Sequence, residues 1–74
     1  MTRYAVVIER ADDGGYGAWS PDLPGVVALA ETEADVLAEM RRAIEFHLEG
    51  LRADGQPIPH PATVAATVVT LNAA

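Results

Sequence analysis

One long segment in the middle of the chain limits its folds most, because it has the pattern of a single, well-bounded helix. Thr32 carries a hydroxyl that can cap the helix N-terminus, and Asp35 follows it as in a capping box. At the other end Gly55 suits the left-handed residue that closes a helix, and three prolines soon after it prevent any continuation. The spacing predicts a helix that begins after Thr32 and ends at Ala53 or Asp54.

The predicted helix has one apolar face. Its large apolar side chains recur every three or four positions, which places them in one stripe that we expect to face the core: Leu37, Met40, Ile44, Leu48 and Leu51. Phe46 lies about 150° from the centre of that stripe in helical projection, among charged residues. A large aromatic side chain there is either an ordinary surface residue or a contact for a partner or a second copy.

Short apolar segments before the helix are typical of β-strands. Residues 4–9 and residues 16–20 predict two strands of a hairpin, with a turn of aspartates and glycines between them. The stretch Pro21-Asp22-Leu23-Pro24-Gly25 predicts an irregular loop at a sheet edge, because proline cannot donate a backbone hydrogen bond. Residues 26–30 predict a third strand.

The segment Thr63 to Leu71 is rich in valine and threonine and predicts a fourth strand. The fold class is therefore α+β: an antiparallel three-stranded sheet, one helix on one face, and a fourth strand at an edge, in the order β-β-β-α-β. We expect a single domain over residues 1–74, because so short a chain cannot support a second core. No cysteine is available for a disulfide, so self-association, giving a homo-oligomer, is the remaining way to add stability.

The chain is acidic. Eleven acidic residues against five arginines and no lysine give a formal net charge of −6. Such a surface repels nucleic-acid phosphates and attracts a basic protein, so direct DNA binding is not expected. The N-terminus runs straight into a strand without the parts of a signal peptide, and no apolar run approaches the roughly 20 residues of a membrane helix. We expect a cytoplasmic protein that does not enter the membrane.

No motif for catalysis, a cofactor or a metal ion is evident. His47 and His60 have no serine or cysteine nucleophile spaced to meet them. Glu9, Asp22 and Glu31 offer oxygen ligands, but nothing in their spacing requires a cation, and a metal-dependent nuclease needs several carboxylates around two metal ions. We therefore expect no catalytic, cofactor-binding or metal-binding residues, and a protein that is not an enzyme.

A few residues are candidates for contact with a partner or a second copy. They are Phe46, Trp19, Asp22 and Leu23. Trp19 is the only tryptophan, and it either contacts a partner or seals the end of the sheet.

Four stretches, held apart by the helix, carry a resemblance to a known family. They are Tyr16 to Gly25 (YGAWSPDLPG), Thr32 before the helix, Ala43 to Glu49 (AIEFHLE) and Gly55 to Pro61 (GQPIPHP). With these, nearly the whole chain resembles the HicB antitoxins. The resemblance implies a partial ribonuclease H-like fold that binds and blocks a small basic ribonuclease toxin of the HicA type, which cleaves mRNA, in a type II toxin–antitoxin system. Ala30 and Glu31 replace the Gly-Asp that often precedes the capping threonine in this family.

Two functions stay open at this point. The first is an antitoxin-like module that neutralises a HicA-type ribonuclease by direct binding. The second is an orphan, self-associating HicB-like domain that has no toxin partner and binds a small ligand between its copies. Antitoxins of this family usually carry a further C-terminal DNA-binding domain, whereas this sequence ends at the predicted fourth strand, so the resemblance does not extend to autoregulation by this chain.

Overall fold

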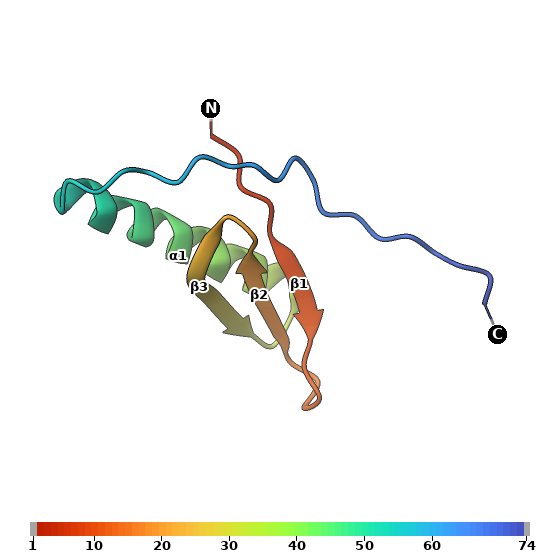
Figure 1. Cartoon of the computed structure of the whole chain (residues 1–74). Helices are drawn as coiled ribbons and strands as arrows, with labels where there is room; N and C mark the ends of the chain where they lie inside the picture. The colour runs from red at the N-terminus through yellow and green to blue at the C-terminus, as the bar shows by residue number, and fades with distance from the viewer. Residues whose placement is uncertain (1, 74) are drawn as a thin grey trace.

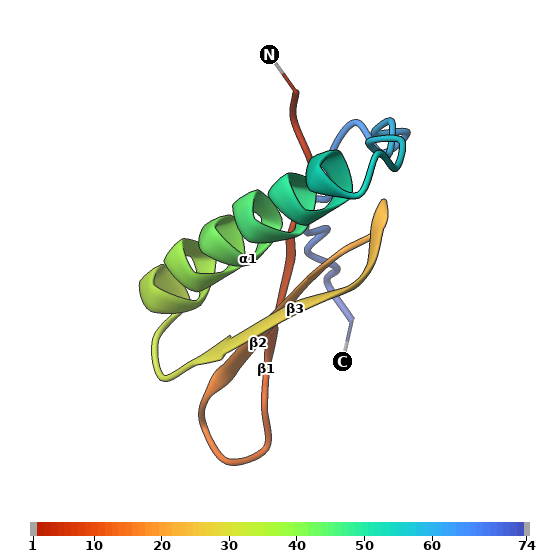
Figure 2. The ribbon, with the colours of Figure 1, turned by 90° about the vertical axis from the view of Figure 1, so that its left-hand side faces the viewer.

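The computed structural model describes residues 2–73 and shows a three-stranded sheet with one helix against one face (Figure 1). The strands are β1 (Val7–Arg10), β2 (Tyr16–Ser20) and β3 (Leu23–Ala30), and the helix is α1 (Glu33–Ala53). The strands are antiparallel and follow one another in chain order across the sheet. Figure 2 shows α1 on one side of the sheet, whose other face it leaves uncovered. The α+β class, the three-stranded antiparallel sheet and the single helix are confirmed.

The predicted hairpin joins β1 and β2. Val7 pairs with Trp19, and Gly14 takes a φ of 92° in the turn, a left-handed conformation that suits glycine. The N–H of Ala11 donates to the carbonyl of Gly15 at 2.8 Å and closes the loop. β1 begins at Val7, later than predicted, and in the same register residues 4 and 5 would lie opposite the turn that follows Ser20 and not opposite β2.

The irregular loop predicted over residues 21–25 is a tight turn followed by a strand. β3 begins at Leu23, which pairs with Ser20, and it includes Pro24 and Gly25. A bulge interrupts the pairing after Trp19, and Gly25 takes a φ of 85° there. Pro24 is tolerated because β3 lies at the edge of the sheet, where a missing N–H removes no ladder bond. The predicted start of the third strand at residue 26 was therefore wrong.

The helix follows its prediction at both ends. The Thr32 hydroxyl accepts a hydrogen bond at 3.1 Å from the backbone N–H three residues later. At the C-terminus Gly55 has a φ of 70°. Its N–H donates to the carbonyl of Arg52 at 3.1 Å, while the next N–H, from Gln56, donates to the carbonyl of Leu51 at 2.8 Å. This pair of bonds is the Schellman motif, which satisfies carbonyls at the helix end.

A small core lies between the sheet and α1. Its buried hydrophobic residues are Ala18, Leu23, Val26, Val36 and Met40. Met40, Ile44 and Leu48 of the predicted stripe pack there, but Leu37 is half exposed and Val36 takes its place. Successive residues lie about 100° apart around the axis of an α-helix. Because Val36 and Met40 face the core, Leu37 lies on the side of the helix.

The predicted fourth strand over residues 63–71 is absent. The structure has no helix or strand between residues 56 and 73. Two hydrogen bonds hold the first part of this segment, from the Tyr4 hydroxyl to the Pro59 carbonyl at 2.6 Å and from the Thr63 N–H to the Asp22 carboxylate at 3.0 Å. Residues 64–73, which we name the arm, then run away from the sheet (Figure 1). The sequence has the propensity for a strand, but a strand needs a neighbouring edge and the arm lies along none.

Candidate partner-binding surface

The face of the sheet opposite α1 is apolar at its centre. Val7, Trp19 and Val27 lie side by side in neighbouring strands, because the register pairs the first with the second and the second with the third. Leu29 lies two residues along β3 and therefore points to the same face. Trp19 is 41% exposed and Leu29 79% exposed. A row of large apolar side chains thus remains in contact with solvent.

A hydrogen bond orients the tryptophan on this open face. The indole Nε1 of Trp19 donates to the Oε1 of Glu9 at 2.8 Å. Glu9 lies on β1 and faces the same side, because it is two residues from Val7. An acidic side chain therefore borders the apolar row, and its carboxylate is engaged with the indole.

A shallow groove continues the apolar surface around the edge of the sheet. It lies between β3 and the C-terminal half of α1, and its lining includes Val27, Phe46, His47 and Asp54. Phe46 is 80% exposed, as its position outside the helical stripe predicted. Because Val27 belongs both to the open face and to this groove, the two features join. We name Trp19, Val27, Leu29 and Phe46 together the β3-edge surface.

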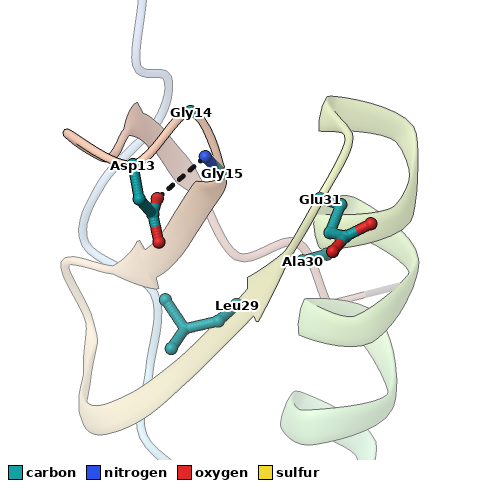
Figure 3. Close-up of a pocket in the computed structure, with 6 residues that line it drawn as sticks. All are labelled: Asp13, Gly14, Gly15, Leu29, Ala30 and Glu31. Carbon is teal, nitrogen blue, oxygen red and sulfur yellow. Dashed lines mark hydrogen bonds between the residues drawn. The ribbon is translucent and has the colours of Figure 1, made fainter.

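The end of this surface beside Leu29 is acidic. Figure 3 shows a hollow between the β1–β2 turn and the start of α1, with Asp13 on one side and Glu31 on the other. The Asp13 carboxylate accepts the N–H of Gly15 at 2.9 Å, which stabilises the turn. With Glu9 near Trp19 and Asp54 in the groove, acidic groups lie around the apolar centre.

The other two sequence-predicted contact residues lie elsewhere. Leu23 is fully buried in the core, so its side chain offers no surface to a partner. Asp22 accepts the N–H of Thr63, and this hydrogen bond holds the pKa of its carboxyl below the ordinary value despite partial desolvation. Of the four candidates, the structure brings Trp19 and Phe46 to the β3-edge surface.

The carboxylates considered for metal binding do not converge. Glu9 is hydrogen-bonded to Trp19, Asp22 is hydrogen-bonded to Thr63, and Glu31 lies in the connection between β3 and α1. Among residues 2–73, no three histidine, aspartate or glutamate side chains come close enough to hold one ion. In that same part of the chain, α1 lacks the run of apolar residues that crossing a bilayer requires.

Sequence reasoning missed Val27 and Leu29. Within the third apolar segment they look like core residues, since every residue from 26 to 30 is apolar. Their exposure follows from the strand alternation, because Val26 and Ala28 point to α1 and their neighbours point away. The signal available in the sequence was that one helix can cover only one face of a sheet.

Comparison with known proteins identifies the family. The model of the HicB-like antitoxin of bacterial toxin–antitoxin systems matches residues 4–72. A UPF0150 protein of Synechocystis sp. is 38% identical over 56 residues, which are 76% of this chain and 71% of that protein. An uncharacterised 14.9 kDa protein from the rep-hol intergenic region of Haemophilus phage HP1 is 34% identical over 56 residues. The match covers only 41% of the phage protein.

A solved structure has the same fold. The crystal structure of the N-terminal domain of the Burkholderia pseudomallei antitoxin HicB superposes with a TM-score of 0.73 at 33% sequence identity. The superposition covers 80% of this chain and 71% of that domain. On the family match over residues 4–72 and on this likeness, the chain belongs to the HicB-like antitoxin family of bacterial toxin–antitoxin systems.

Proposed function

We propose that this chain acts as an antitoxin that neutralises a small basic ribonuclease of the HicA type by binding it directly. Family membership supports the antitoxin role. The observation that carries direct binding is the β3-edge surface, whose apolar centre lies among acidic side chains. In this proposal the chain works by covering the toxin and catalyses nothing itself. Its place of action is the cytoplasm, where a ribonuclease meets mRNA.

The two properties of the surface serve different steps of binding. The net charge of −6 attracts a basic protein over a distance and raises the rate of encounter. Phe46 and Trp19 then bury apolar area against the toxin, and aromatic residues are frequent among the few that dominate binding energy. Binding across this surface would block the toxin either at its active site or at its RNA-binding groove.

The proposal is tested by expressing the chain with the small basic protein encoded beside it. We expect the two to purify as one complex, and we expect the chain to relieve the toxicity of its neighbour. A neighbour that neither binds the chain nor becomes less toxic would contradict the antitoxin role.

Single substitutions test whether the toxin binds the β3-edge surface. Phe46→Ala and Leu29→Glu should each weaken the complex by tenfold or more, because they remove an anchor or place a charge in the apolar centre. Leu37→Ala is the matched control, since it removes a half-exposed apolar side chain nine residues from Phe46, on the opposite flank of α1. A complex equally weakened by all three changes, or by none, would show that the toxin binds another surface.

A second candidate is a self-associating domain that has no toxin. The arm favours it, because four of its large apolar side chains are exposed in the single chain. This candidate predicts a multimer in the purified chain and no effect on any neighbouring protein.

A further inference from the structure

The arm has the amino-acid composition of a β-strand, but no neighbouring strand among residues 2–73 pairs with it. Residues 62–74 contain no charged side chain and are rich in valine and threonine, which favour β-structure. Its large apolar side chains are between 74% and 93% exposed: Val64, Val68, Val69 and Leu71. An uncharged, β-branched segment of this kind readily pairs with another strand when it is left in water. The sequence of the arm therefore favours pairing with another strand, and the described part of the single chain provides none.

The start of the arm is fixed in a direction that leads away from its own sheet. The Asp22 carboxylate holds the Thr63 N–H at 3.0 Å, and the Tyr4 hydroxyl holds the Pro59 carbonyl. The first arm residues pass beside the N-terminal segment, since Val64 and Tyr4 line the same hollow. The rest then leaves the body (Figure 1), and the molecule measures 51 × 25 × 19 Å.

The sheet offers one regular edge for an added strand. The order β1-β2-β3 leaves the outer sides of β1 and β3 without a neighbouring strand among residues 2–73. The β3 edge is interrupted by Pro24, which has no N–H, and by the bulge at Gly25. The β1 edge, Val7–Arg10, contains neither proline nor glycine. Its backbone groups are therefore the better template.

We propose that the arm of one copy adds as a fourth strand to the β1 edge of a second copy, and that the exchange is reciprocal. A two-fold axis then relates the copies, and each gives one arm and receives one. Two bodies of charge −6 repel each other, but the arm is neutral, so the contact brings no like charges together. The β-propensity of residues 63–71 would then be satisfied between chains. This inference needs no toxin and is tested without one.

The first test measures the mass of the purified chain by light scattering. We expect twice the 7.8 kDa of one copy. Of Val68→Pro and Val69→Pro, made separately, at least one should give the mass of one copy, because proline removes an N–H and alternate N–H groups face the neighbouring strand. Val68→Thr is the matched control and should keep the doubled mass, since threonine is β-branched and retains its N–H.

All of these variants should keep the fold, because Val68 is 89% exposed in the single chain. An unchanged circular dichroism spectrum checks this. A parent chain with the mass of one copy would overturn the proposal. So would a doubled mass that both proline variants retain.

Cross-linking identifies the edge that receives the arm. The chain has no cysteine, so an introduced one is unique. Glu9→Cys on β1 is mixed with a second protein that carries a cysteine at arm position 68, 69 or 70, and the mixture is oxidised. We expect a mixed disulfide for at least one of the three positions, because a bridge forms when the two Cα atoms lie within about 7 Å.

Glu49→Cys on the exposed side of α1 replaces Glu9→Cys as the control. The mixed disulfide should then be at least tenfold less abundant. Equal yields with both partners, or none with Glu9→Cys, would overturn the assignment of the arm to the β1 edge.

Discussion

The side chain of Asp22 fixes the position of the C-terminal segment through one hydrogen bond. It lies in the turn between β2 and β3, and its carboxylate accepts the N–H of Thr63, forty-one positions further along the chain. That bond sets the point at which the arm leaves the body. The role of Asp22 in partner contact, which its place in the sequence suggested, stays a prediction.

The bond between Asp22 and Thr63 should depend on pH. The hydrogen bond from Thr63 favours the charged carboxylate, and it lowers the pKa of Asp22 from 3.8 in the folded chain. Its contribution to stability is therefore complete above pH 3.8 and is lost as the pH falls through the lower, folded-state pKa. The NMR shift of the Thr63 amide proton should change in that acidic range, and Asp22→Ala should abolish the change. An identical titration in the variant would contradict this account.

Ser20 is the residue whose replacement should help the fold. Its side chain is buried, and its hydroxyl has no hydrogen-bond partner among residues 2–73. Removing an unsatisfied polar group from a core is neutral or favourable, so Ser20→Ala should raise the free energy of unfolding by 0 to about 1 kcal/mol. Urea denaturation measures the change.

The neighbouring core position provides the control for Ser20. Ala18→Ser buries a new hydroxyl two residues away and should lower stability by about 1 to 3 kcal/mol. A Ser20→Ala chain less stable than its parent would show that the hydroxyl has a bonding role.

At the scale of elements, the helix was predictable because its signals are local. Its cap, its apolar period and its closing glycine all lie within the segment itself. The strands depend on their neighbours, which the sequence does not display. From the sequence, Pro24 predicts a break in a strand, but β3 is an edge strand and can include a proline. The arm predicts a strand, but no strand in the described part of the chain lies beside it to pair with.

The candidate surface, like the fold, was predictable from the sequence only in part. Helical phase located Phe46 correctly, because the period of a helix is fixed. Trp19 was chosen for its size and rarity, and it does lie on the surface. Leu23 was chosen from a presumed loop and is buried, while Leu29 was missed because the exposed face follows from the strand register.

Two glycines of the helical region should respond to alanine in opposite ways. Gly55 has a φ of 70°, where an alanine is strained, so Gly55→Ala should lower stability by about 1 kcal/mol. Gly50 lies inside α1, and a Cβ there meets nothing within 4 Å, so Gly50→Ala should raise stability by about 0.5 to 1 kcal/mol. Thermal unfolding of both variants measures the two changes. Shifts of the same sign would show that the helix ends differently in solution.

At the scale of the whole molecule, a small core supports a strongly charged surface. Five hydrophobic residues are buried among residues 2–73, and the sequence has no cysteine for a disulfide. Short chains bury a smaller fraction of their surface than long ones, so their stability is marginal. Contact with a second copy or with a toxin would bury additional apolar area and stabilise the folded chain by mass action.

The charge of the molecule should control the rate of toxin binding. Salt screens charges over about 10 Å at 0.1 M and about 3 Å at 1 M, so the association rate with a basic toxin should fall steeply over this range. The dissociation rate should change less. Stopped-flow measurements separate the two, and an association rate independent of salt would contradict electrostatic steering. Salt should not dissociate the dimer, because the arm is neutral and screening only weakens the repulsion between the two acidic bodies.

The position of Trp19 has a practical consequence. It is the only tryptophan, and it stands partly exposed on the open face, so its fluorescence reports on the polarity of that face without any added label. A toxin that covers the face would exclude water from the indole and move its emission to shorter wavelength. An arm added at the outer side of β1 would leave the emission nearly unchanged, because β1 lies between them. The fluorescence of Trp19 thus distinguishes toxin binding from the proposed addition of an arm to β1.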